Sequence, residues 1–194
     1  IAAGEEDACE KLMYALVLSG LAMQMTGNSR PASGAEHHLV HLWDMEVVNG
    51  HLDALHGEKV SAGTMLVLLE YKKIADAIRK GNCKVHTCTE EDRELLQSTF
   101  GKKGILGAIE KENTPELLDD VSTKELSDTL PGILKIIDAL PAVTDMQEMM
   151  NTAGCVSRVR DIGLPGEGIE ESLRLAPYTR RRLSLLRLRK MLTY

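Results

Sequence analysis

Three histidines, His37, His38 and His41, lie within five positions of one another, directly after a turn rich in Pro, Ser and Gly. Two more follow at His51 and His56, so that five of the six histidines fall in one short segment. Imidazole is a common ligand for divalent metals and a common acid–base group near neutral pH. This segment is therefore the first candidate for a metal-binding or acid–base site.

The spacing of these histidines suits a shared metal site. On a helix, His37 and His41 lie one turn apart and share a face, whereas His38 lies about 100° further round and points elsewhere. His56 precedes the start of another expected helix, where a loop residue can turn back toward the first one. Ligation by His37 and His56 with His41 nearby, and direct ligation by all three, both fit this pattern.

A plainer reading is that the histidines are surface residues or buried residues with satisfied hydrogen bonds. The order of residues is not the H-E-x-x-H of metalloproteases, because Glu36 precedes the first histidine. Asp44 and Asp53 could each supply a carboxylate ligand, but neither has a distinctive spacing. The pattern alone thus predicts an incomplete metal site. Zinc, nickel and iron all accept imidazole together with carboxylate.

The turn before the histidines, GNSRPASG, has features of an anion site. Asn28, Ser29 and Arg30 lie just before an expected helix, whose free N–H groups attract negative charge. Arg30 adds a guanidinium, which matches phosphate in geometry and charge. The same residues also fit a plain turn between a loop and a helix.

Helices are the elements expected to position these residues. Residues 5–26 begin with acidic side chains and are apolar on nearly every side, which is typical of a central, fully packed helix. Ser33 and Glu36 have the spacing of a capping box, which predicts a second helix running to about Val48. Residues 57–80 form a third expected helix, with basic residues in its last turns.

Shorter helices are expected in the second half of the chain, separated by turn signals. They cover about 90–99, 104–111, 115–119, 123–128, 131–139, 144–153, 167–175 and 178–192. Leu130-Pro131 places proline where the first turn of a helix tolerates it. Residues 82–89 are a weak strand candidate, and no other stretch alternates convincingly. The predicted fold class is an all-α multi-helix bundle with at most a short two-stranded sheet.

The composition is that of a globular protein. The 194 residues are 43% hydrophobic and 27% charged, which is enough to bury a core. The net charge of −6 gives no reason to expect nucleic acid or an anionic membrane as partner. The longest apolar run, Leu12 to Met25, falls short of the roughly 20 residues that a bilayer span needs. The four cysteines form no C-x-x-C pair, so we expect free thiols in the cytoplasm.

Two segments, SGLAMQMTGNSRPASGAEHHLVHLWDM and LHGEKVSAGT, resemble the glycerol-1-phosphate dehydrogenase branch of the iron-containing alcohol dehydrogenase superfamily. GNSRPASGAEHH is specific to this branch, whereas HGEKV is shared more widely. The resemblance extends less distinctively to AGCVSRVRDIGL and LRLAPYTRRRLSLLRL near the end of the chain. It implies that residues 1–194 form the C-terminal helical, metal- and substrate-binding domain of a dehydroquinate synthase-like fold, without the N-terminal dinucleotide-binding domain.

The resemblance also implies roles for the histidines. His37 and His56 match the positions of two metal ligands, which the family completes with an aspartate, and the ion would be zinc, nickel or iron. The position implied to face the substrate is His41, as the catalytic group. With a phosphorylated substrate, the anion site expected at Arg30, Ser29 and Asn28 would bind the substrate phosphate. The implied reaction is reversible hydride transfer between NAD or NADP and glycerol 1-phosphate, giving dihydroxyacetone phosphate. The metal would act as a Lewis acid on the reacting oxygen.

This chain departs from the family pattern in two ways. The aspartate ligand of the family lies further upstream than the 36 residues that precede His37, and Asp7 is too close to be that ligand. The glycines of GKKGILG (101–107) cannot replace a nucleotide-binding loop, because no strand precedes them. We therefore expect a fragment that is inactive alone, that pairs with its own N-terminal domain and that forms homo-oligomers.

Two other functions fit the same residues. One is a polyol or glycerol dehydrogenase of the same superfamily, and the other is a non-catalytic helical module that retains the histidines. The intact set of His37, His41 and His56 favours an enzyme, and a metal analysis of the purified protein separates these classes.

Overall fold

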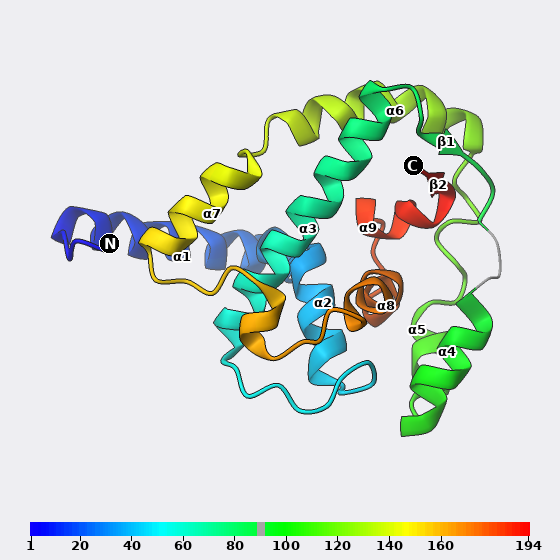
Figure 1. Cartoon of the computed structure of the whole chain (residues 1–194), viewed down its shortest axis with the longest axis horizontal. Coiled ribbons are helices and arrows are strands. Elements are labelled where there is room, and N and C mark those ends of the chain that lie inside the picture. Colours follow the sequence, from blue (N-terminus) through cyan, green and yellow to red (C-terminus); the bar gives the residue numbers. More distant parts are fainter. Residues whose placement is uncertain (89–91) are drawn as a thin grey trace.

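The computed structural model describes residues 1–88 and 92–194, which are mainly helical (Figure 1). The α-helices are α1 (Glu6–Thr26), α2 (Ala35–Asp44), α3 (His56–Arg79), α4 (Arg93–Phe100), α5 (Leu106–Glu112), α6 (Thr123–Asp138), α7 (Val143–Thr152), α8 (Gly168–Leu175) and α9 (Leu185–Leu188). The 3₁₀ turns are η1 (Arg30–Ala32), η3 (Gly101–Lys103), η4 (Val159–Ile162), η5 (Ala176–Thr179) and η6 (Arg189–Met191). Strands β1 (Lys84–Val85) and β2 (Leu192–Thr193) pair in an antiparallel manner. The predicted all-α class is confirmed for the described residues.

The main hydrophobic core encloses α2 between α3, α8 and the C-terminal turn η5. Helix α2 contributes Ala35 to this core, together with Leu39, Val40, Leu42 and Trp43, which are each at most 1% exposed. The indole Nε1 of Trp43 donates a hydrogen bond of 2.9 Å to Ser172 Oγ on α8. Because α2 is held from several sides, the directions in which its histidines project are set by the core.

A smaller apolar cluster closes the other end of α3. It joins Ile74 of α3 to α6 and to the C-terminal strand, and its buried members are Ile74, Leu118, Leu126, Leu130, Met191 and Leu192. Figure 1 shows α6 lying across this end of α3, beside β1. The last residues of the chain are thereby packed against its middle.

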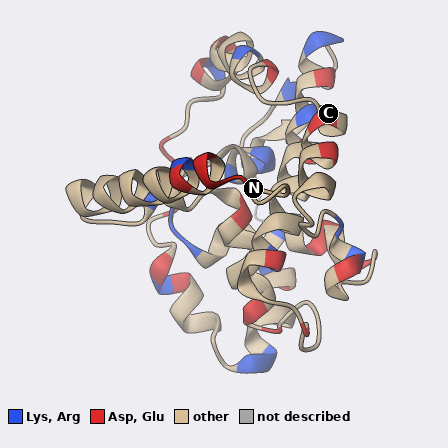
Figure 2. Ribbon diagram, turned by 90° about the vertical axis from the view of Figure 1, so that its left-hand side faces the viewer, with Lys and Arg blue, Asp and Glu red and all other residues tan. Residues whose placement is uncertain are grey.

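Helix α1 contradicts the expectation of a central, fully packed helix. None of its 21 residues is buried, and Figures 1 and 2 show it extending away from the other helices. Its charged side chains are confined to the first turns (Figure 2), and further along Met13 is 59% and Met25 88% exposed. Neither α1 nor another described helix is long and apolar enough to cross a membrane. The sequence correctly indicated that α1 is apolar, but none of the other described elements buries its side chains.

We expect this exposed apolar helix to make the chain self-associate, because large bare apolar patches are rarely left in contact with water. Replacing Leu16 and Val17, which are 57% and 56% exposed, with glutamate should shift the mass measured by light scattering toward the monomer. Ile136 on α6 is 68% exposed, and Ile136→Glu is the matched control that should change nothing. A wild-type monomer that binds no hydrophobic dye would contradict this prediction.

Helix α2 is shorter than predicted at both ends. Its N-cap is Gly34, and Glu36 Oε1 accepts a hydrogen bond from the Gly34 N–H at 2.7 Å, so the capping box expected from Ser33 does not form. The helix ends at Asp44 and does not reach Val48. Glu46 adopts a left-handed conformation with φ of 52°, which cannot continue a right-handed helix.

Two further expectations about helix boundaries are wrong. Residues 123–128 and 131–139 form one helix, α6, with Pro131 inside it, because Leu126, Leu130 and Ile137 bury one continuous face. Residues 115–119 form a turn instead of a helix.

The predicted helix over 178–192 is also wrong, because the chain breaks it into η5, α9 and η6. The side chain of Arg187 donates to the carbonyl oxygens of Pro177 and Arg180, and these bonds fold the segment back on itself. The expected helix over 90–99 is observed from Arg93 to Phe100, and residues 90 and 91 lie outside the described residues. The weak strand candidate 82–89 contains β1, with residue 89 outside the described part.

Candidate functional site

His37 on α2 and His56 at the start of α3 face one another. Their ring centroids are 5.8 Å apart, and the ring planes are tilted by 53°. A metal–nitrogen bond of about 2.1 Å puts each ring centroid about 3 Å from the ion, so two ligating rings can lie up to about 6 Å apart. The expectation that His56 turns back toward α2 is confirmed.

Close packing of α2 on α3 brings this pair together. A Cβ atom placed on Gly63 of α3 would lie 3.2 Å from the carbonyl oxygen of Glu36, which is tighter than ordinary van der Waals contact. Glycine at this position therefore lets the two helices approach next to His37, two turns along α3 from His56. The sequence HGEKVSAG carries both His56 and this glycine on α3.

The tautomer of His37 is set by its neighbour Glu36. Desolvation opposes ionisation of Glu36, but hydrogen bonds from His37 and from the Gly34 backbone hold the pKa of this carboxyl below its ordinary value. The distance from Glu36 Oε1 to His37 Nδ1 is 2.8 Å. Since an ionised carboxylate only accepts hydrogen bonds, Nδ1 carries a proton, and in the neutral imidazole Nε2 then presents its lone pair. A carboxylate partner of this kind commonly orients a metal-binding histidine.

His41 belongs to the same group of side chains. Its pKa lies below the ordinary value because partial burial disfavours its charged form, with the positive charge of Arg180 as the next cause. His41 is therefore neutral at neutral pH, with one nitrogen free to accept a proton. Arg180 was missed by sequence reasoning, although the run of three arginines at 180–182 was a signal for it.

His38 lies apart from the histidine pair, as expected from its place on the helix. It is 1% exposed and lines a pocket together with Arg30 and Arg182. Desolvation, followed by the charge of Arg182, lowers its pKa to about 4. Neither ring nitrogen has a hydrogen-bond partner within the described residues.

None of the three predicted substrate-binding residues of the GNSRPASG turn forms a hydrogen bond with His41 among the described residues. Asn28 Oδ1 accepts a hydrogen bond from the Arg30 N–H at 2.9 Å, so it stabilises the turn itself. Ser29 Oγ accepts one from Arg182 Nη2 at 3.0 Å. Arg30 lines the same pocket of about 420 Å³ as His38, and His41 is not among the residues that line it.

A third metal ligand is not supplied by the part of the chain that the structure describes. No group of three or more His, Cys, Asp or Glu side chains there could hold a metal ion. Asp44, one carboxylate considered from the sequence, instead forms an ion pair of 2.8 Å with Lys59. The residues present therefore fit two of the ligand positions of a metal site.

Comparison with known proteins yields relatives that include several glycerol-1-phosphate dehydrogenases. The chain is 34% identical to the glycerol-1-phosphate dehydrogenase [NAD(P)+] of Halalkalibacterium halodurans over 187 residues, which is 96% of the chain and 39% of the relative. The protein of the same name from Geobacillus stearothermophilus is 29% identical over 177 residues, or 91% of the chain and 37% of the relative. The one from Pyrococcus horikoshii is 40% identical over 80 residues, or 39% of the chain and 22% of the relative.

The chain thus spans less than two fifths of the length of these curated relatives. No family model and no solved structure matches it.

Proposed function

The chain is homologous along nearly its whole length to the glycerol-1-phosphate dehydrogenases, and on that premise we propose that it is the C-terminal, metal- and substrate-binding domain of such an enzyme. The observation that carries this proposal is the facing pair of His37 and His56, with Glu36 fixing the tautomer of His37. The substrate is glycerol 1-phosphate, the product is dihydroxyacetone phosphate, and the oxidant is NAD or NADP.

In this proposal, Nε2 of His37 and the imidazole of His56 hold one divalent ion, which is zinc, nickel or iron. When bound, that ion supplies Lewis-acid stabilisation of negative charge on the reacting oxygen. The third ligand, an aspartate, and the nucleotide site belong to an N-terminal domain outside residues 1–194. The enzyme acts in the cytoplasm and is a homo-oligomer.

The neutral imidazole of His41 faces the substrate and accepts a proton from its hydroxyl group. Arg180 adds positive charge beside His41, which suits a substrate that carries a phosphate. Desolvation keeps His41 neutral, so the side chain is available as a base without first losing a proton. The substrate contacts predicted for Asn28 and Ser29 stay predictions, because both side chains serve the turn itself.

The proposed reaction is tested by following NADH or NADPH formation from glycerol 1-phosphate, in protein that also contains the nucleotide-binding domain. We expect turnover that a chelator abolishes and that added zinc, nickel or iron restores. Unphosphorylated glycerol, assayed in parallel, should be a poor substrate. Equal turnover of glycerol would point to a polyol dehydrogenase instead, and turnover that survives complete metal removal would contradict the proposal.

Glu36→Gln should weaken metal binding about 10- to 100-fold, because a neutral amide orients His37 less firmly and makes its Nε2 a poorer ligand. Metal affinity is measured by titrating the chain with Co²⁺ and following its absorption bands. Glu58→Gln is a matched control, since Glu58 Oε2 also accepts a backbone N–H at a helix start, from Leu55 at 2.7 Å. Equal affinities of the two variants would show that Glu36 only caps its helix.

A further inference from the structure

A pocket of about 420 Å³ lies between the start of α2 and the segment that follows η5. Its wall contains Arg30, Arg181 and Arg182, together with His38, and no Asp or Glu is among its lining residues. The chain as a whole carries a net charge of −6. A pocket with three guanidinium groups and no carboxylate is therefore a local exception to the charge of the molecule.

The guanidinium of Arg182 is held in place without being neutralised. Its Nη1 donates to the carbonyl oxygen of Ser33 at 2.7 Å, and its Nη2 donates to Ser29 Oγ at 3.0 Å. Both acceptors are uncharged, and no ion pair of Arg182 is found among residues 1–88 and 92–194. The positive charge thus stays available to a ligand, while the side chain loses little freedom when one binds.

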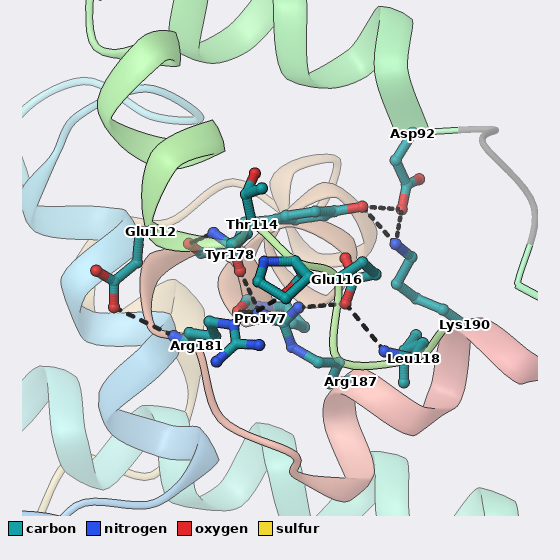
Figure 3. Close-up of polar contacts among 12 residues, drawn as sticks. Asp92, Glu112, Thr114, Glu116, Leu118, Pro177, Tyr178, Arg181, Arg187 and Lys190 are labelled. Atoms are coloured by element: carbon teal, nitrogen blue, oxygen red, sulfur yellow. Dashed lines mark hydrogen bonds and ion pairs between the residues drawn. The ribbon is translucent and has the colours of Figure 1, made fainter. Parts of the chain in front are cut away.

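The other two arginines also keep their charge. Arg181 donates from Nε to the carbonyl oxygen of Pro115 at 3.0 Å, and its backbone N–H lies 3.5 Å from a carboxylate oxygen of Glu112 (Figure 3). Arg30 is exposed, and its side chain forms no ion pair in the described ranges. Three arginines therefore line the pocket, and their side chains form no ion pair among the described residues.

His38 gives an independent sign that this pocket takes a ligand. The side chain is 1% exposed, and both of its ring nitrogens lack a hydrogen-bond partner in the described part of the chain. Buried polar atoms in proteins nearly always have a partner, and an unpaired one commonly marks a place for a water or an ion. A neutral imidazole has one N–H to donate, which matches an acceptor oxygen.

The start of α2 also borders this pocket, since Gly34 and Ala35 form part of its wall. The carboxylate of Glu36 accepts the Gly34 N–H at this point, so the donors available to an anion are side chains and not the helix start. The arginine and histidine side chains that line the pocket suit an anion with several acceptor oxygens.

We propose that this pocket binds a phosphate group, with Arg30 and Arg182 as its charged contacts and His38 as a buried hydrogen-bond donor. The site is separate from the histidine pair, because neither His37 nor His56 lines the pocket. The phosphate is free inorganic phosphate or the phosphoester end of a small ligand. The choice of glycerol 1-phosphate as that ligand rests on the proposed function, whereas binding of the phosphate itself does not.

Calorimetric titration of the chain with inorganic phosphate tests the site. We expect saturable binding, which Arg30→Gln weakens at least about tenfold by removing one charged contact. Arg30 is exposed and unpaired, so this variant should keep its unfolding temperature. Arg158→Gln, which removes an exposed arginine beside a different pocket, is the matched control and should bind phosphate as the wild type does. Equal weakening in both variants, or no saturable binding, would overturn the proposal.

A second arm identifies the source of the phosphate and separates this site from the metal site. If Arg30→Gln weakens binding of glycerol 1-phosphate as much as binding of inorganic phosphate, the ligand is a phosphoester. If the variant weakens binding of inorganic phosphate alone, the ligand is the free ion. In proton NMR spectra, phosphate should shift the ring resonances of His38 and leave those of His56 in place. Shifts at His56 alone would overturn the proposal. Phosphate binding with no dehydrogenase activity would count against the proposed function only.

Discussion

Replacing His56 with alanine is expected to abolish metal retention without disturbing the fold. His37 would then be the only imidazole left at the proposed metal position, and affinity falls steeply when a ligand is lost. His56 is exposed at the first position of α3, so its removal creates no cavity. The measurement is metal content after dialysis against a weak chelator, alongside a circular-dichroism spectrum.

His41→Ala should separate binding from turnover. In protein that contains the nucleotide-binding domain, this variant should keep its metal and lower kcat about 10²- to 10⁴-fold, as expected for loss of an acid–base group. His51→Ala is the matched control, because His51 lies in the same segment but pairs with Glu46 at 2.9 Å, away from the site. The assignment fails if His56→Ala retains as much metal as the wild type, or if His41→Ala loses metal equally.

The second large effect is expected at Arg187, which joins three segments at once (Figure 3). Its guanidinium is 1% exposed and donates to Glu116 Oε1 at 2.7 Å and to Asn113 Oδ1 at 2.5 Å. It also donates to the carbonyl oxygen of Pro177 at 2.5 Å, and it lies over the ring of Tyr178 at 5.8 Å. The segment after α5 is thereby tied to the C-terminal segment.

Arg187→Met should lower the free energy of unfolding by about 3–5 kcal/mol, because it leaves a carboxylate and an amide oxygen without their buried charged partner. Arg187→Lys should recover little of this, since one ammonium cannot reach acceptors on three sides as a planar guanidinium does. Urea unfolding followed by circular dichroism measures both losses.

Arg79→Met is the control for that comparison. Arg79 forms ion pairs of 2.5 and 2.8 Å with Asp76 and Asp138, but all three side chains are about half exposed. Exposed ion pairs contribute about 0–1 kcal/mol, so the variant should be nearly as stable as the wild type. If Arg79→Met and Arg187→Met lowered the free energy of unfolding by similar amounts, burial of the arginine would not determine how much it contributes to stability.

The helical class and the closeness of His37 to His56 were predicted from the sequence. These features are local, because the side-chain period of a helix decides which residues share a face. His37 and His56 could be expected to face one another because only a short connection separates α2 from α3 in the sequence. The helix boundaries were less certain, since a single residue such as Glu46 ended α2 early.

The exposure of α1 and the arginine pocket were decided only by the tertiary structure. An apolar pattern indicates which faces of a helix avoid water, but it does not indicate which surface covers them. The apolar sequence of α1 therefore predicted burial, whereas none of its residues is buried in the structure. The hydrogen bond from Arg182 to Ser29 spans 153 positions of the chain, and the one from Trp43 to Ser172 spans 129. Contacts at such separations depend on how the whole chain packs, and no local spacing in one sequence encodes them.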